Sequence, residues 1–321
     1  MERRGLGHTE VAVSPIGLGC WQFSRGTGAV GRYWPALPQA EVIDIVRSSM
    51  NNGVNWFDTA EIYGRGDSER SVSEALQALG APPSAVVVAT KWWPLFRGAE
   101  SIVNSLAERE EYLRPYRVSL YQIHHPYAFS TLRTQMQMLC QLSFSRRIAA
   151  TGVSNFSAYQ LNASEQVMRE YGLHLASNQV KYSLLDRRIE QNGVLETARK
   201  LGVTIIAYSP LEQGLLAGKY HDESGRRAQG LRRLQRKFAP AALQRTRPLI
   251  DLLREIAGGH RATPAQIALA WVIRFHGGDV CAVAGARTVA QAQENALAMQ
   301  VKLTGDELQR LDEVSRMVSL K

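Results

Sequence analysis

The 321-residue chain is 45% hydrophobic and 21% charged, which allows a substantial core and excludes global disorder. Its formal net charge of +9 is compatible with nucleic acid, a membrane surface or an anionic small molecule, so charge alone selects no function. Three widely spaced cysteines, Cys20, Cys140 and Cys281, lack the spacing of a metal site and are typical of a reducing compartment.

Short apolar runs alternate with longer amphipathic segments along the chain. Residues 11–19 are predicted to form a strand ending in Gly17-Leu18-Gly19, and a helix is predicted over 40–52. The apolar runs predict further strands over residues 54–57, 86–90, 118–124, 148–154, 175–180, 203–208 and 280–284. Amphipathic spacing predicts further helices over residues 68–79, 101–113, 131–142, 158–171, 190–201, 241–257, 264–275 and 289–299. A long polar section runs from 211 to about 240.

This order gives roughly eight strand-then-helix units. The strands are near-continuous apolar runs, which is typical of parallel strands buried on both faces. The pattern predicts an α/β protein with a (β/α)₈ TIM barrel. A doubly wound sheet is the alternative, but its G-x-G-x-x-G motif is incomplete, because Cys20-Trp21-Gln22 follows Gly17-Leu18-Gly19. No Pro/Ser-rich linker divides the chain, so we expect one domain over residues 1–321.

The chain carries no targeting or membrane signal that the sequence reveals. Residues 1–19 lack the long apolar core of a signal peptide. No apolar run approaches the ~20 residues needed to span a bilayer. The sequence therefore predicts a soluble protein of the cytoplasm, without a membrane partner.

Much of the positive charge lies in one basic stretch within the long polar section. Its members are Arg226, Arg227, Arg232, Arg233, Arg236 and Lys237. A solvated loop or helix face, a lid over an anion, and a nucleic-acid patch are three interpretations of such a stretch. The stretch has few aromatic residues on which bases could stack, which disfavours nucleic acid as a partner.

Four side chains at or just beyond strand ends form a chemically sensible group, and chemistry in such a barrel lies where the strands end. Asp58, Lys91 and His124 each close a predicted strand, and Tyr63 follows Asp58 by about one turn. A tyrosine has a pKa of about 10, which a neighbouring Lys91 would lower. Asp58 could hold Lys91, and His124 could orient a substrate oxygen. Together they would make a general acid that requires no metal.

Each of these residues also has a purely structural interpretation. Asp58 could cap a turn, Tyr63 could be a half-buried aromatic, and Lys91 could be a solvated strand end. His124 could be a hydrogen-bonded core histidine. All four residues fall at one predicted end of the barrel. Purely structural roles therefore explain the four together less well than they explain any one of them. His125 should point to the other side of its strand by the period-two rule, which indicates a structural role.

Longer stretches of the sequence, in the same order and at barrel spacing, are similar to the aldo-keto reductase superfamily over nearly the whole chain. Each motif is weak alone, and the ordered set is very specific. The stretches are Arg4–Gly7 and Val13–Gly19 for an N-terminal hairpin and first strand, Asn55–Gly64, Ala89–Lys91, Leu120–His124, Gly152–Phe156, and Tyr208–Leu211 with Gly214–Leu216 for a long loop after the seventh strand.

The resemblance implies roles for residues of this chain. Tyr63 would be the general acid or base, tuned by Lys91 and Asp58, and His124 would position the carbonyl. The implied cofactor contacts, from the nicotinamide through the pyrophosphate to the adenosine, are Ser154, Asn155, Gln179, Tyr208, Ser209, Leu211, Gly214, Gly285, Arg287, Gln291, Glu294 and Asn295. Leu211 and Gly214 would offer backbone N–H groups to the pyrophosphate. Arg287 could meet a 2′-phosphate, which favours NADPH over NADH.

Two segments depart from the resemblance, and both departures are local. Residues 138–147 stand where relatives commonly have a short Gly-Lys turn, and residues 280–285 have an alanine where a proline is common. The Asp58, Tyr63, Lys91 and His124 set is intact.

Aromatic residues just beyond the strand ends are expected to line the mouth of the site. They are Trp21, Trp92, Trp93 and Phe96, although ordinary core packing would also explain them. Such a mouth suits an apolar or ring-shaped carbonyl compound. The leading hypothesis is therefore an NADPH-dependent reductase of a small-molecule aldehyde or ketone. The alternative is a regulatory subunit that senses bound NADPH, as potassium-channel β subunits of this superfamily do.

Overall fold

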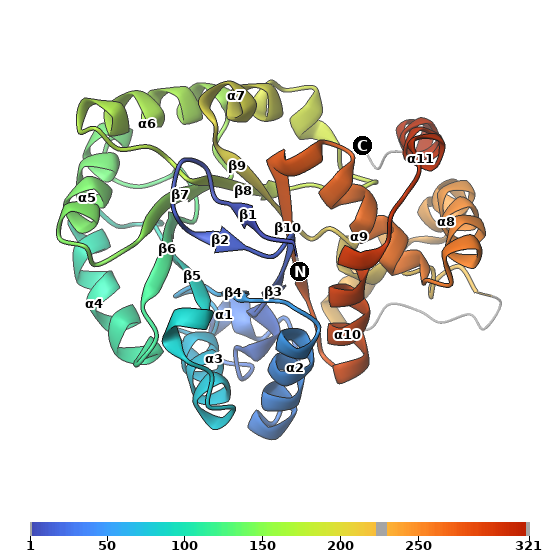
Figure 1. Cartoon of the computed structure of the whole chain (residues 1–321), viewed down its shortest axis with the longest axis horizontal. Coiled ribbons are helices and arrows are strands. Elements are labelled where there is room, and N and C mark those ends of the chain that lie inside the picture. The colour runs from blue at the N-terminus through green and yellow to red at the C-terminus, as the bar shows by residue number, and fades with distance from the viewer. Residues whose placement is uncertain (1, 223–229, 319–321) are drawn as a thin grey trace.

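Eight parallel strands close into a barrel in this computed structural model, which describes residues 2–222 and 230–318 (Figure 1). Each strand pairs with the next along the chain, and the last pairs with the first. The strands are β3 (Ile16–Gly19), β4 (Trp56–Asp58), β5 (Val87–Trp92), β6 (Val118–Ile123), β7 (Ala150–Ser154), β8 (Ser177–Lys181), β9 (Thr204–Tyr208) and β10 (Val280–Gly285). The expected (β/α)₈ barrel is confirmed.

Helices form a ring around the barrel (Figure 1). They are α2 (Gln39–Asn51), α3 (Asp67–Ala78), α4 (Ser101–Leu113), α5 (Leu132–Phe144), α6 (Ala158–Glu170), α7 (Val194–Leu201), α9 (Pro264–Arg274) and α10 (Val289–Leu297). The four-residue α1 (Gly28–Gly31) lies in the connection between β3 and α2. Two more helices, α8 (Pro240–His260) and α11 (Gly305–Val318), pack on each other at one side. The sequence reasoning missed α11.

A short antiparallel hairpin, β1 (Arg4–Gly5) with β2 (Ala12–Val13), crosses the end of the barrel that faces the viewer in Figure 1. Leu6 and Val13 are fully buried against side chains inside the barrel. The N-terminal hairpin that the resemblance implied is therefore present, and it seals the end at which the strands begin.

The barrel interior has an apolar layer near the hairpin and a polar layer beyond it. Because side chains alternate along a strand, the residue two positions later faces the same interior. Pairs of this kind, with the hairpin-side residue first, are Trp56 and Asp58, Ala89 and Lys91, Leu120 and Gln122, and Ile206 and Tyr208. The polar layer consequently lies at the carboxyl ends of the strands, where the loops meet.

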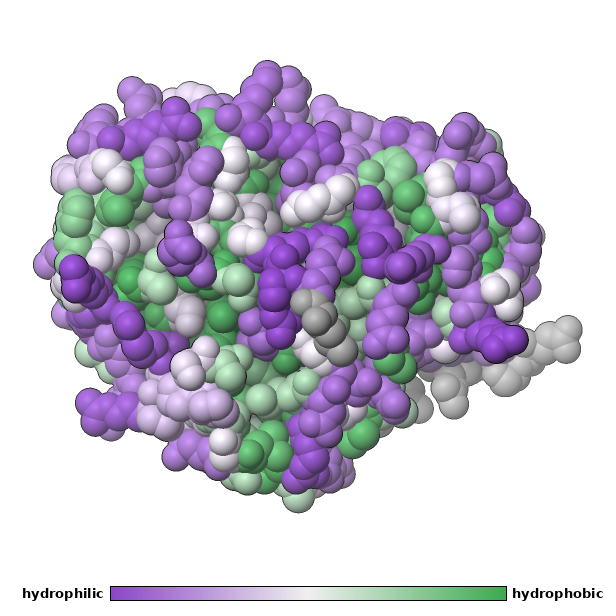
Figure 2. Space-filling view, viewed as in Figure 1, coloured by the Kyte–Doolittle hydropathy of each residue, from purple (hydrophilic) through white to green (hydrophobic). Residues whose placement is uncertain are grey.

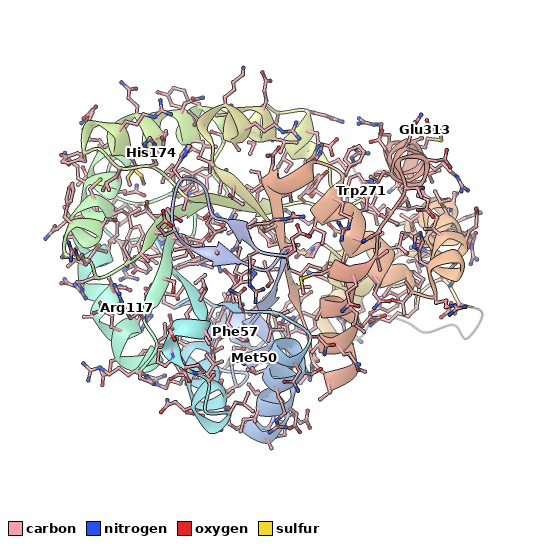
Figure 3. The ribbon with its side chains drawn as sticks, viewed as in Figure 1. Met50, Phe57, Arg117, His174, Trp271 and Glu313 are labelled. Carbon is pink, nitrogen blue, oxygen red and sulfur yellow. The ribbon has the colours of Figure 1, made fainter. Side chains whose placement is uncertain are left out.

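The intervening residues of each strand point outward and pack under the helices. Phe57 lies between Trp56 and Asp58, is fully buried, and joins the large cluster between barrel and helices together with Trp271 of α9. Figure 3 shows both side chains within the packed interior and Glu313 on α11. On the same face in Figure 2, hydrophilic residues cover much of the outer helices.

The structure corrects one predicted helix and adds detail to the long polar section. The helix predicted over 190–201 is a 3₁₀ turn at Arg188–Glu190 followed by α7, because Gly193 adopts a left-handed conformation (φ 81°) between them. The polar section after β9 contains short 3₁₀ turns at Gly230–Leu234 and Arg236–Phe238, while Arg226 and Arg227 lie outside the described residues. Within the described ranges, no helix is both long and apolar enough to cross a membrane.

Gly17 makes room for the Trp56 indole in the apolar layer, and this predicts a large effect of one methyl group. A Cβ on Gly17 would lie 2.3 Å from Trp56 Cε2. We expect Gly17→Ala to lower the free energy of unfolding by about 1–3 kcal/mol, because the packed ring cannot move away. Gly258→Ala in α8, where a Cβ meets nothing within 4 Å, is the control and should stabilise by about 0.5–1 kcal/mol. Urea denaturation measures both, and equal effects would contradict the packing argument.

Candidate active site

A cavity of about 940 Å³ opens at the carboxyl ends of the strands. Tyr63, His124, Trp21 and Trp93 line it, and so does Asp58 at its base. All of the expected cofactor-binding residues line it as well: Ser154, Asn155, Gln179, Tyr208, Ser209, Leu211, Gly214, Gly285, Arg287, Gln291, Glu294 and Asn295. The structure therefore brings the residues singled out from the sequence to one cavity, with three exceptions described below: Lys91, which lies beneath it, Trp92 and Phe96.

Lys91 forms an ion pair with Asp58 beneath the cavity. Its side chain is fully buried, and its ammonium donates to Asp58 Oδ2 (2.6 Å) and to Thr59 O (2.8 Å). The other Asp58 oxygen accepts from the amides of Gln179 (2.8 Å) and Gln122 (3.4 Å). Lys91 is therefore no solvated strand end, and Asp58 caps no turn. The sequence reasoning missed Gln122, which the same-face spacing on β6 could have indicated.

Tyr63 is half-buried and lies close to this ion pair. The Lys91 ammonium is 5.3 Å from the centroid of its ring. Burial, followed by the negative charge of Asp58, raises the pKa of Tyr63 well above its usual value. The expectation of a lowered pKa is wrong for this structure, because burial of the phenol and the negative charge of Asp58 outweigh any effect of the lysine charge. Tyr63 is therefore a protonated phenol at neutral pH, in the state needed to donate a proton.

His124 stands edge-to-face against Tyr63, with ring centroids 5.8 Å apart. Burial and the nearby Lys91 lower the pKa of His124 well below its usual value, so the imidazole is neutral. Its Nδ1 is buried and has no hydrogen-bond partner among the described residues. His125 stacks on it at 5.5 Å and also lines the cavity. The expected outward orientation of His125 is wrong, because β6 ends at Ile123 and the alternation stops there.

The side chains expected at the nicotinamide form a hydrogen-bonded floor beside His124. Asn155, in a left-handed conformation (φ 62°), donates to His124 O (3.1 Å) and accepts from Tyr208 Oη (3.0 Å). Ser154 Oγ donates to Gln179 O (2.8 Å). This floor fixes the Tyr208 ring and the His124 backbone relative to each other.

The turn after β9 is held in an unusual backbone conformation. Ser209, Glu212 and Gln213 have positive φ angles of 53°, 48° and 59°, which non-glycine residues rarely adopt. The buried Glu212 carboxylate is paired with Lys181 and Lys237, both at 2.8 Å. The strained turn is thus anchored by a carboxylate between two ammonium groups.

One implied backbone donor in this turn is already engaged. The Gly214 N–H, which the resemblance would offer to a pyrophosphate, donates to Leu211 O (2.9 Å). The sequence reasoning also missed Lys181, although it lies two residues after Gln179 on the same face of β8.

Two guanidinium groups flank the Trp34 ring at the far end of the cavity. Arg232 lies 5.1 Å and Arg287 6.0 Å from the ring centroid. Burial and the charge of Arg232 lower the pKa of Arg287. Neither arginine forms an ion pair with a carboxylate in the described part of the chain. Two neighbouring cations without an ion-paired carboxylate among the described residues, offset only by the weaker effect of Glu41 on Arg287, give this end of the cavity a positive charge.

Two of the aromatic residues expected at the mouth do not line the cavity. Trp92 is fully buried and its indole donates to Ser101 Oγ (3.0 Å). It is the next residue of β5 after Lys91, so its side chain points to the opposite face. Phe96 is 74% exposed in the following loop, beside Phe129. The expected pocket roles of Trp92 and Phe96 are therefore wrong.

The ion pair predicts that Lys91→Met destabilises the protein. The change leaves the buried Asp58 carboxylate without a cation, which should cost about 3–5 kcal/mol of unfolding free energy. The double variant Asp58→Asn with Lys91→Met should recover part of that loss, because no buried charge remains. Urea denaturation gives the three values. A single variant as stable as the wild type would show that the pair does not hold the polar layer together.

Proteins of related sequence match the chain over almost all of its length. A family model described as the Aldo/keto reductase family matches residues 15–316. A relative from Mycobacterium tuberculosis, named an uncharacterized oxidoreductase, is 38% identical over 305 residues, which are 95% of this chain and 90% of the relative. A protein from Glycine max, named probable aldo-keto reductase 1, is 28% identical over 320 residues, 96% of this chain and 87% of the relative.

Solved structures of proteins with related sequences are also similar to this chain. A glycerol dehydrogenase from Gluconobacter oxydans has a TM-score of 0.85 at 26% identity, covering 99% of this chain and 97% of its own. A thermostable aldo-keto reductase, solved with the inhibitor epalrestat, has a TM-score of 0.77 at 28% identity, covering 98% of this chain and 100% of its own. The chain belongs to the aldo/keto reductase family.

Proposed function

We propose that the protein is an NADPH-dependent oxidoreductase that reduces an aldehyde or ketone to an alcohol, with Tyr63 as general acid. The observation that carries this proposal is the buried Lys91–Asp58 pair directly beneath Tyr63 and His124, at the base of a large cavity. A protonated phenol, a neutral imidazole and a fixed ammonium are the groups needed to protonate a carbonyl oxygen as negative charge develops on it.

Each residue has a distinct task in this proposal. Tyr63 Oη donates its proton to the substrate oxygen, and the neutral His124 ring hydrogen-bonds the same oxygen and orients it. Lys91 stabilises the phenolate left on Tyr63, because a positive charge close to the ring favours the ionised form. Asp58 keeps Lys91 in place. When bound, the reduced nicotinamide supplies the hydride for the carbonyl carbon.

The cavity has features that fit a dinucleotide phosphate. Tyr208 and the Asn155 floor would hold the nicotinamide, with the carboxamide exchanging some of the hydrogen bonds described above. Arg287 and Arg232, unpaired with any described carboxylate, would bind the 2′-phosphate that distinguishes NADPH from NADH. The anion would also relieve the repulsion between the two guanidinium groups.

The substrate end of the cavity is aromatic, and this supports an apolar or ring-shaped carbonyl compound. The Trp21 ring stacks on Tyr63 at 6.0 Å, and Trp93 stands edge-on to His124 at 5.2 Å. A reducing compartment, the cytoplasm, is the proposed location, and its support is that all three cysteines are free and buried.

Tyr63→Phe should abolish turnover while leaving the cavity intact, because phenylalanine keeps the ring packing and lacks the proton. We expect kcat to fall by about 100-fold or more with a panel of aldehydes and ketones, followed by the loss of NADPH absorbance. NADPH binding, measured by fluorescence, should be unchanged.

In the wild type, the rate of reduction should be independent of pH across the neutral range. It should decline only as pH rises through the raised pKa of Tyr63 or falls through the lowered pKa of His124. A Tyr63→Phe variant that turns over like the wild type would exclude Tyr63 as the general acid.

Arg287→Ala and Arg232→Ala should each weaken NADPH binding by about 10–100-fold, since each removes a charge-assisted contact to the 2′-phosphate. NADH binding should change little, because NADH lacks that phosphate. Arg233→Ala is the matched control, as Arg233 is exposed and does not line the cavity. Equal losses for NADPH and NADH would contradict the assignment of this site to the 2′-phosphate.

A further inference from the structure

Glu61 lies two residues before Tyr63 in the loop between β4 and α3, but its carboxylate does not line the main cavity. Its backbone N–H donates to Lys91 O (3.2 Å), and its C=O accepts from Gly66 N–H (3.1 Å). The carboxylate lines a second, smaller cavity of about 380 Å³. The main chain of Glu61 is therefore fixed to the strand that carries Lys91, while its side chain is directed elsewhere.

That side chain is held by groups from two other elements. The Glu61 carboxylate pairs with Arg97 of the β5–α4 loop and accepts a hydrogen bond from Ser105 of α4. Arg109 of α4 lies 3.6 Å from the same carboxylate. Arg109 is only 3% exposed, so its contact with Glu61 is largely desolvated, whereas the Arg97 side chain is 32% exposed. Truncating one partner of such a network leaves the other charges without compensation.

Arg109 also reaches a second carboxylate, on the far side of Tyr63 in the sequence. Its Nε lies 3.1 Å from Glu69 Oε2 in the first turn of α3. Glu69 is fully buried, and its carboxylate accepts a hydrogen bond from Thr90 Oγ1 (2.5 Å). Thr90 is the residue before Lys91 on β5. Burial outweighs the attraction of Arg109 and raises the pKa of Glu69 to about 7. One guanidinium thus spans both ends of the segment that carries Tyr63.

The segment between these carboxylates needs such external support. Gly64, Arg65 and Gly66 are three consecutive left-handed residues, with φ angles of 71°, 54° and 92°. This conformation is costly for Arg65, and it persists only where the surrounding structure determines it. Tyr63 immediately precedes these residues, so the position of its phenol depends on what fixes the loop.

The same network also reaches Trp93, which lines the main cavity. Arg97 donates to Trp93 O (3.2 Å), and the Trp93 ring is 5.2 Å from His124. Glu61 therefore connects the loop that carries Tyr63 to the loop that carries Trp93. Movement of one loop relative to the other would change the distance between the phenol and the imidazole.

We propose that Glu61, Arg97 and Arg109 are positioning residues, which hold the Tyr63 loop in register with His124 and Lys91. None of the three lines the main cavity, so each acts through Tyr63 and touches neither substrate nor cofactor. The inference rests on the proposed function, in which Tyr63 is the proton donor. A displacement of about 1 Å at a reacting group can cost on the order of 100-fold in rate.

The test compares Arg109→Met and Glu61→Ala with a matched control at another arginine–glutamate pair that involves α4. Arg147→Met is that control, because Arg147 pairs with Glu110 of α4 at 2.6 Å in a more exposed position. We expect kcat to fall about 10–100-fold in the first two variants, with the substrate KM and NADPH binding unchanged. Arg109→Lys keeps the positive charge, and its kcat should lie between those of Arg109→Met and the wild type. Arg147→Met should behave like the wild type.

Glu61→Gln keeps the shape of the side chain and its acceptor for Ser105. Where Glu61→Ala or Arg109→Met fails to fold, the kcat of Glu61→Gln takes its place in the comparison with Arg147→Met. Wild-type kcat in folded Arg109→Met, or equal losses in it and Arg147→Met, would overturn the positioning role. That result, together with an inactive Tyr63→Phe, would leave the proposed function standing. Absence of wild-type turnover on every carbonyl compound would overturn the proposed function and this inference with it.

Discussion

The buried ion pair between Lys91 and Asp58 is the constraint on which the rest of the site depends. Removing two charges from water is costly, and the cost is offset only where the remaining polar atoms are also satisfied. Here Thr59 O accepts from the ammonium, and the Gln179 and Gln122 amides donate to the carboxylate. These groups come from four different strand ends, so the closed barrel is needed to assemble them. The hairpin and the apolar layer exclude water from the other end.

Three loops next to this polar layer contain residues in unusual backbone conformations. The turn after Tyr63, Asn155 after β7, and the turn from Ser209 after β9 all contain left-handed residues. Each is held by buried polar groups: Glu61 with two arginines, the Asn155 amide with its neighbours, and Glu212 with two lysines. Strain in loops of this kind is a feature of functional sites, where the surrounding structure fixes an otherwise unfavourable conformation. The regular strands provide the frame, and the charged contacts determine where the loops place their side chains.

Sequence reasoning predicted the barrel and the residues at the strand ends, because both follow from hydrophobic periodicity. It failed where one residue changes the outcome: β5 includes Trp92, whereas β6 stops before His124. Sequence reasoning also failed to predict the direction of the pKa shift of Tyr63, since that shift depends on how deeply the phenol is buried and on the nearby charge of Asp58. Contacts such as that between Arg109 and Glu61 join elements far apart in the chain, and no spacing rule indicates them.

The most direct test of the account is to follow the transferred atom. The enzyme would be given NADPH carrying deuterium at C4 of the nicotinamide, on the face that is transferred, and an aldehyde, and the alcohol analysed by NMR. The account predicts one deuterium on the carbon that was the carbonyl carbon, formed by the wild type and not by Lys91→Met. An alcohol without deuterium at that carbon, or a Lys91→Met variant that forms the labelled alcohol at the wild-type rate, would contradict it.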